Sequence, residues 1–105
     1  MNILFICSRN KWRSATAENI YKNHPDHQVR SAGTALSARI KINKKLIIWA
    51  DLIFVMEKKH KQRITEHFPE ETCNKEIITL HIPDDYQYMD EELIEELNAK
   101  VADYL

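Results

Sequence analysis

The first 21 residues decide the fold, and they read MNILFICSRNKWRSATAENIY (residues 1–21). Residues 3–6 are all apolar, which is typical of a parallel strand that is buried on both faces. Cys7 follows directly, and three cations come within the next six residues. Small and polar residues then begin a helical pattern. We therefore expect a strand, a basic loop that opens with a cysteine, and a helix.

The rest of the chain repeats this alternation. Helical patterns follow each predicted strand, with Ser14, Asn43 and Asp90 as candidate N-caps and Pro69 as a stop signal. Alternating strands and helices favour a parallel sheet with helices on both faces, joined by right-handed connections. Ligands bind such sheets beyond the carboxyl ends of the strands. The four predicted strands are residues 2–6, 28–32, 52–56 and 76–80.

Length and composition indicate one ordinary globular domain. The chain has 105 residues, of which 44% are hydrophobic and 30% charged. No apolar run approaches the ~20 residues of a membrane-spanning helix, and the start does not resemble a signal peptide. We expect a cytoplasmic protein that has no membrane partner, and the sequence predicts no oligomeric state.

The cysteines and histidines do not predict a metal or a cofactor. Cys7 and Cys73 are not at zinc-ligand spacing, and a disulfide between them is not expected in a reducing compartment. We interpret the scattered histidines as mostly solvated loop residues, and metal binding as the lesser alternative. They stand at positions 24, 27, 60, 67 and 81.

The net charge of −1 hides a strong asymmetry. Residues 1–63 carry 13 Lys or Arg against 4 Asp or Glu, whereas residues 64–105 carry 2 against 12. We favour the interpretation that the two parts pair electrostatically in the folded chain. The alternative is a basic face that attracts an anionic ligand, with an acidic segment beside it.

The loop after the first strand can perform nucleophilic chemistry. Loop amides and the helix dipole would favour a thiolate at Cys7 and would hold a tetrahedral oxyanion. Arg13, after five intervening residues, could grip two oxygens of that anion with its planar fork. Ser14 could donate a hydrogen bond to the thiolate. The competing interpretation is a buried core thiol beside a solvated arginine.

Four blocks of sequence resemble the low-molecular-weight protein tyrosine phosphatases. ILFICSRNKWRSATAE is similar to their signature of cysteine, five residues, arginine and serine. RSAGT (30–34), WADLIFVMEKKH (49–60) and PDDYQY (83–88) resemble their second strand, third strand and Asp-Pro-Tyr loop. The resemblance implies one such α/β domain over residues 1–105. It has a four-stranded parallel sheet of order 2-1-3-4, helices on both faces and a phosphate-binding loop after the first strand.

The resemblance also implies a two-step mechanism without a cofactor. Cys7 attacks phosphorus to form a phosphocysteine, Arg13 stabilises the transition state, and Asp84 protonates the leaving group and then activates water. Asp85 is the reserve candidate for the acid, and an acidic turn is the alternative for both. The residues implied to bind substrate are Ser8, Arg9, Asn10, Lys11, Trp12 and Ser14 in the loop, with Tyr86 and Tyr88 as aromatic walls.

Several departures from the family bear on the substrate. Arg9 stands where relatives carry glycine, and it is strained if the backbone there needs a positive φ, unless the position already lies in an allowed region. Ser8 and Lys11 replace apolar wall residues, Trp12 replaces a frequent second cysteine, and the stretch after Thr34 is unusually short. We expect an open, basic pocket that prefers a highly charged phosphate, such as a nucleotide, a nucleic-acid end or a phosphorylated metabolite, over an isolated phosphotyrosine.

Three other classes remain as alternatives. IIB components of the sugar phosphotransferase system resemble this chain in size and in a phosphorylatable strand-end cysteine, but they are carriers and do not need Arg13 or Asp84. Arsenate reductases of this type need further redox cysteines, for which Cys73 is a poor substitute. A catalytically weak phosphate-binding module would result if Arg9 deforms the loop.

Overall fold

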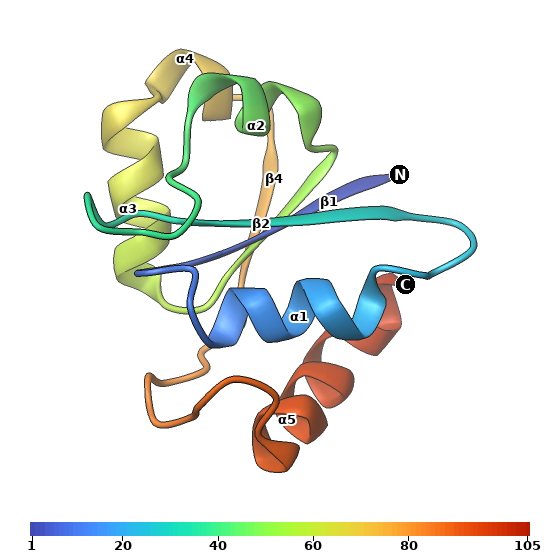
Figure 1. Ribbon diagram of the computed structural model, residues 1–105. Helices are drawn as coiled ribbons and strands as arrows, with labels where there is room; N and C mark the ends of the chain where they lie inside the picture. The colour runs from blue at the N-terminus through green and yellow to red at the C-terminus, as the bar shows by residue number, and fades with distance from the viewer.

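The sheet has the predicted topology. The computed structural model describes all 105 residues, Met1–Leu105, and its four parallel strands are arranged in the order β2-β1-β3-β4 (Figure 1). The predicted order 2-1-3-4 and the α/β class are therefore confirmed, and the strand ends differ from prediction by at most one residue. The strands are β1 (Asn2–Cys7), β2 (Gln28–Gly33), β3 (Leu52–Val55) and β4 (Glu76–Thr79).

Helices cover both faces of this sheet. Figure 1 shows α1 and α5 together on one side, and α2, α3 and α4 on the other. No helix is long and apolar enough to cross a membrane. The helices are α1 (Arg13–Tyr21), α2 (Lys44–Trp49), α3 (Lys58–His67), α4 (Pro69–Thr72) and α5 (Glu91–Val101), followed by a 3₁₀ turn, Ala102–Tyr104.

Strand alternation decides the side of the sheet on which the cysteine emerges. Ile3, Phe5 and Cys7 belong to the core cluster that packs against α1 and α5. Leu4 and Ile6 belong to the cluster on the opposite face, against α2 and α3. Because successive side chains of a strand point to opposite faces, Cys7 reaches the carboxyl end of the central strand on the α1 side.

Two of the predicted caps are confirmed and one is wrong. Asn43 and Asp90 each accept a hydrogen bond from a main-chain N–H in the first turn of α2 and α5. Ser14 instead lies inside α1, and its hydroxyl is 3.0 Å from the Sγ of Cys7. Pro69 follows the end of α3, as predicted, and it is also the first residue of α4, where its missing N–H costs nothing.

The basic and acidic parts of the chain are not joined by many ion pairs. Of the six ion pairs in the structure, only Arg13 to Asp84 connects residues 1–63 with residues 64–105. The interpretation that the two parts pair electrostatically therefore has little direct support. The two apolar clusters hold the elements together, and the alternative interpretation of a basic face gains weight.

The single glycine of the chain allows the loop after β1 to lie against the end of β2. A Cβ at Gly33 would lie 2.5 Å from the carbonyl oxygen of Ser8 and 2.7 Å from the Cβ of Ala38. Its φ is not positive, so the requirement is for space and not for an unusual backbone conformation. Gly33 therefore permits the close approach on which the loop depends.

We predict that Gly33→Ala destabilises the protein by about 2–3 kcal/mol, because the atoms nearest to the new methyl group are backbone atoms of Ser8 and Arg9 and the Cβ of Ala38, none of which is the end of a flexible side chain. Urea unfolding followed by circular dichroism measures this change. Leu36→Ala is the matched control, since Leu36 lies nearby and is 80% exposed. Equal stabilities for the two variants would contradict the packing argument.

Candidate active site

The loop between β1 and α1 turns its carbonyl groups away from the pocket. The carbonyl oxygens of residues 7, 8, 9 and 10 all accept hydrogen bonds from residues 34–39. Their donors are the N–H of Thr34, the N–H of Ala35, the N–H of Arg39 and the Nε of Arg39, at 3.0, 2.8, 2.9 and 3.1 Å in that order. One short segment thus satisfies four successive carbonyls of the loop.

The N–H groups of the same loop are left for a ligand. Those of residues 8–12 donate no hydrogen bond within the protein, and they precede the positive end of α1. Such a set of amides is a site for an anion. Asn10 has a φ of 55°, a left-handed conformation that asparagine tolerates, whereas the φ of Arg9 is not positive. Arginine in place of the usual glycine is therefore unstrained.

A chain of hydrogen bonds reaches the sulfur from below. The Nδ2 of Asn10 donates to the hydroxyl oxygens of Ser14 at 2.7 Å and Ser31 at 2.8 Å. Because the Oγ of Ser14 accepts from this amide, its own proton can go either to the Sγ of Cys7, 3.0 Å away, or to the carbonyl oxygen of Ala32, 3.4 Å away. Asn10 and Ser14 are fully buried, so they brace the loop and the sulfur from beneath.

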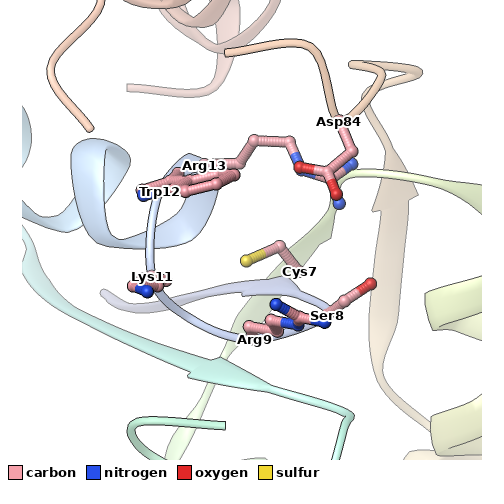
Figure 2. Close-up of a pocket in the computed structure, with 7 residues that line it drawn as sticks. All are labelled: Cys7, Ser8, Arg9, Lys11, Trp12, Arg13 and Asp84. Atoms are coloured by element: carbon pink, nitrogen blue, oxygen red, sulfur yellow. The ribbon is translucent and has the colours of Figure 1, made fainter. Parts of the chain in front are cut away.

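Arg13 is held rigidly with part of its guanidinium group free. Its Nη1 donates to Glu57 at 2.9 Å and to the carbonyl oxygen of Ile82 at 2.8 Å. Its Nε lies 3.6 Å from the Oδ1 of Asp84, which is too long for a good hydrogen bond. Figure 2 shows the carboxylate of Asp84 beside this guanidinium and across from the sulfur of Cys7. The Nε and Nη2 edge can therefore face an anion.

Glu57 is the carboxylate that anchors Arg13. Burial by itself would raise its pKa, but the hydrogen bond and charge of Arg13 outweigh burial, with smaller contributions from Lys59 and His60, and the net pKa is lowered. Glu57 also caps α3, because its side chain accepts from the N–H of His60 while its own N–H donates to the ring of His60. Sequence reasoning assigned Glu57 no role.

His60 corrects the prediction of solvated loop histidines. It lies in α3 and is only 1% exposed, and its Nε2 is 2.9 Å from the hydroxyl of Ser8. Burial and the nearby charge of Arg13 lower its pKa to about 4, so the ring is neutral at physiological pH. The spacing of Glu57 and His60 is that of a capping box, and this signal could have placed the histidine at the start of a helix.

The pocket above the loop has a volume of about 330 Å³ and a basic lining (Figure 2). Three cations and a single carboxylate contribute to it, and Asp85 does not. No three His, Cys, Asp or Glu side chains come together to hold a metal ion. The lining residues are Cys7, Ser8, Arg9, Lys11, Trp12, Arg13 and Asp84.

The structure does not bring the two predicted wall tyrosines into this pocket. Tyr86 packs against the core and lines another hollow beside α5. There, burial and then acidic neighbours raise its pKa. Tyr88 lines a shallow hollow next to Lys11. The reason is that the N–H of Met89 donates to the hydroxyl of Thr16 at 2.9 Å, which ties the segment to α1 beside the pocket.

Comparison with known proteins agrees with this geometry. No protein-family model matches the chain. The low-molecular-weight protein-tyrosine-phosphatase Wzb of Escherichia coli K12 is 34% identical over 93 positions, a match that covers 66% of this chain. The structure of Wzb from Escherichia coli K30 in complex with phosphate covers 98% of this chain and 94% of its own, with 26% identity and a TM-score of 0.78.

The chain belongs to the low-molecular-weight protein tyrosine phosphatase and arginine phosphatase family. It is a distant member, and the match covers 63% of the length of the curated Wzb proteins. The YwlE arginine phosphatase of Geobacillus stearothermophilus is 25% identical, with a TM-score of 0.66 over 98% of this chain and 94% of its own. Tyrosine and arginine phosphatases are thus both among the relatives of this phosphatase-like chain.

We predict that the buried ring of His60 makes folding sensitive to acid. Its pKa is about 4 in the folded state against about 6.5 in an unfolded chain, so the unfolded state binds more protons between these values. The free energy of unfolding therefore falls as the pH drops from about 6.5 towards 4, by up to about 3 kcal/mol from this group. Urea unfolding at several pH values measures the slope.

His60→Gln is the control for this slope, because glutamine does not titrate. Above pH 5, where most carboxylates remain ionised, the stability of this variant should change less with pH than that of the wild type. Identical slopes for the two proteins would show that His60 is not buried in its neutral form.

Proposed function

We propose that the chain hydrolyses phosphomonoesters through a phosphocysteine intermediate. One observation carries the proposal: Cys7 shares a pocket with unpaired loop amides, and the anchored Arg13 and Asp84 lie side by side in that pocket. These are a nucleophile, an oxyanion site and a candidate acid in one place. Membership of a phosphatase family supports the reaction class.

In the first step, the thiolate of Cys7 attacks phosphorus while the three equatorial oxygens lie against the amides of residues 8–12 and the free edge of Arg13. The phosphorus–sulfur bond forms as the bond to the leaving oxygen breaks. Asp84, protonated at the start, gives its proton to that oxygen. The side chain of Asp84 is 55% exposed and lies 3.6 Å from Arg13 without a tight hydrogen bond to it. The carboxyl group is therefore free to approach the leaving oxygen of the substrate.

In the second step, water attacks the phosphorus of the phosphocysteine. Asp84, now a carboxylate, takes a proton from that water, and the phosphorus–sulfur bond breaks with its electrons returning to sulfur. Inorganic phosphate leaves, and Asp84 is again protonated. Ser14 donates to Sγ at 3.0 Å and so stabilises the thiolate as leaving group, an effect worth about 1.5–3 kcal/mol for a hydrogen bond to a charged group.

The basic lining favours a substrate with more negative charge than a phosphotyrosine. Arg9 and Lys11 line the pocket, but the reaction as described does not need them. Neither wall tyrosine is there to stack on a phenolic ring. We infer that a second anionic group near the ester, as in a nucleotide, a nucleic-acid end or a phosphorylated metabolite, is attracted by these two cations.

The same cations disfavour phosphoarginine. The guanidino group of a phosphoarginine carries a positive charge next to phosphorus, and Arg9 and Lys11 would repel that charge. Although an arginine phosphatase is among the structural relatives, its substrate does not suit this lining.

We predict that three single changes abolish or strongly reduce hydrolysis of an aryl phosphate. Cys7→Ser removes the thiolate nucleophile and should leave no measurable turnover. Asp84→Asn removes the acid and should lower kcat by roughly 10²–10⁴. Arg13→Lys keeps the charge but loses the planar fork, and it should cost roughly 10²–10³. Steady-state kinetics on purified variants measure these losses.

Asp85→Asn is the matched control, because Asp85 is the neighbour of Asp84 but does not line the pocket. It should retain wild-type activity. A loss in Asp85→Asn without a loss in Asp84→Asn would reassign the acid. Full activity in Cys7→Ser would refute the mechanism, and a wild-type phosphocysteine that accumulates and passes to another protein would indicate a carrier.

We predict that polyanionic phosphates are better substrates than phosphotyrosine peptides, and that the preference depends on the lining cations. Arg9→Gln and Lys11→Gln should each raise KM for a nucleoside bisphosphate by up to ~5-fold, with less effect on an aryl phosphate that carries no charge beyond its single phosphoryl group. Lys22→Gln, at an exposed position outside the pocket, is the control. A panel in which phosphotyrosine peptides outperform every polyanion would refute the substrate preference.

A further inference from the structure

The N-terminus of α3 holds both ends of the loop after β1. At the end of the loop, the Oε2 of Glu57 accepts from Arg13 at 2.9 Å. At its beginning, the Nε2 of His60 lies 2.9 Å from the hydroxyl of Ser8. Glu57 and His60 are themselves joined by two reciprocal hydrogen bonds of the capping box. The N-terminal end of α3 thus contacts the side chain of Ser8 at the start of the loop and the side chain of Arg13 at its end.

The hydrogen-bond directions around His60 follow from its surroundings. The N–H of Glu57 can only donate, and it lies 3.0 Å from Nδ1, which must therefore accept. In the neutral ring the proton is then on Nε2, and it is donated to the Oγ of Ser8. A protonated ring would place a second donor against the N–H of Glu57, so the contact works with the neutral ring alone.

The side chain of Ser8 is directed towards this contact and not towards the sulfur. Figure 2 shows the hydroxyl oxygen of Ser8 pointing away from the Sγ of Cys7. His60 is the only side chain that it bonds, while its carbonyl is held from the opposite side by the N–H of Ala35 at 2.8 Å. The first residue of the loop is thus fixed between α3 and the segment after β2.

We propose that His60 is a positioning residue, which by holding Ser8 sets the first amides of the loop in register with Arg13 for a bound phosphoryl group. The proposal rests on the proposed function for its chemical purpose. His60 has no contact with the substrate, and it acts through the loop. Because Arg13 is fixed through Glu57 in the same capping box, movement of His60 would shift one end of the anion site relative to the other.

The chain offers a set of conservative variants that separate the two hydrogen bonds of the ring. In His60→Asn the amide oxygen can take the place of Nδ1 and keep the cap, but nothing reaches Ser8. In His60→Gln the amide nitrogen can take the place of Nε2 and still donate to Ser8. Ser8→Ala removes the acceptor itself. Lys61→Gln, at an exposed position of α3, is the control.

Two measurements are made on each variant, with urea unfolding to verify that it is folded. The first is kcat and KM for an aryl phosphate. The second is the affinity for inorganic phosphate, followed by the fluorescence of Trp12 in a Trp49→Phe background, which does not require turnover. We expect His60→Asn and Ser8→Ala each to lower kcat/KM and phosphate affinity by about 3- to 10-fold, and His60→Gln to recover most of the loss.

The double variant Ser8→Ala/His60→Asn should lose no more than either single variant, because both remove the same hydrogen bond. Additive losses, or equal losses in His60→Gln and His60→Asn, would overturn the proposal and leave His60 as a packing residue. Failure of the proposed function is distinguishable: the wild type would then bind phosphate with the expected pattern among variants but would not hydrolyse the ester.

Discussion

The direction of the peptide groups in the loop after β1 is the constraint on which the site depends. Four successive carbonyls accept hydrogen bonds from donors of residues 34–39, and the N–H groups of residues 8–12 donate to no group of the protein. An unpaired buried carbonyl costs roughly 1–3 kcal/mol, so a loop turned the other way would lose several such bonds at once. The anion site is therefore a consequence of where the carbonyls are satisfied.

This arrangement explains several residues that are far apart in the sequence. Position 33, opposite Cys7 in the sheet register, has to be a glycine because the carbonyl of Ser8 leaves no space for a Cβ there. Arg39 supplies two of the four donors, so a short segment suffices where related proteins have a longer one. Asn10 adopts the one left-handed backbone conformation of the loop, with a φ of 55°. Because asparagine tolerates this conformation, the loop does not need a glycine.

Electrostatics at the site are arranged around Arg13. Its charge is buried, and it is tolerated because Glu57 and the carbonyl of Ile82 pair with one side of the guanidinium. The same charge helps to keep His60 neutral, and the neutral ring can donate to Ser8. A single buried cation thus helps to lower the pKa of two neighbours and leaves its free edge for an anion.

Local patterns were sufficient to predict the strands and the residues around Cys7, whereas the sheet order 2-1-3-4 was implied by the family resemblance. Continuous apolar runs predict buried parallel strands, and the spacing of Cys7, Arg13 and Ser14 places a thiol beside a helix start, because these effects act between neighbours in the chain. One local prediction nevertheless failed. Ser14 does not cap α1, and its hydroxyl lies 3.0 Å from the sulfur of Cys7 instead. Tyr86, to which the resemblance gave a place in the pocket wall, packs against the core.

The sequence by itself thus determined the architecture, the candidate nucleophile and the basic character of the loop. Only the tertiary structure decided which groups hold that loop in place. Arg39 and His60 reach it from segments 29 and 52 residues away, and no periodicity or spacing records a hydrogen bond between such distant positions. Their roles arise when the sheet brings the carboxyl ends of β1, β2 and β3 to one edge, because only then do buried polar groups find their partners.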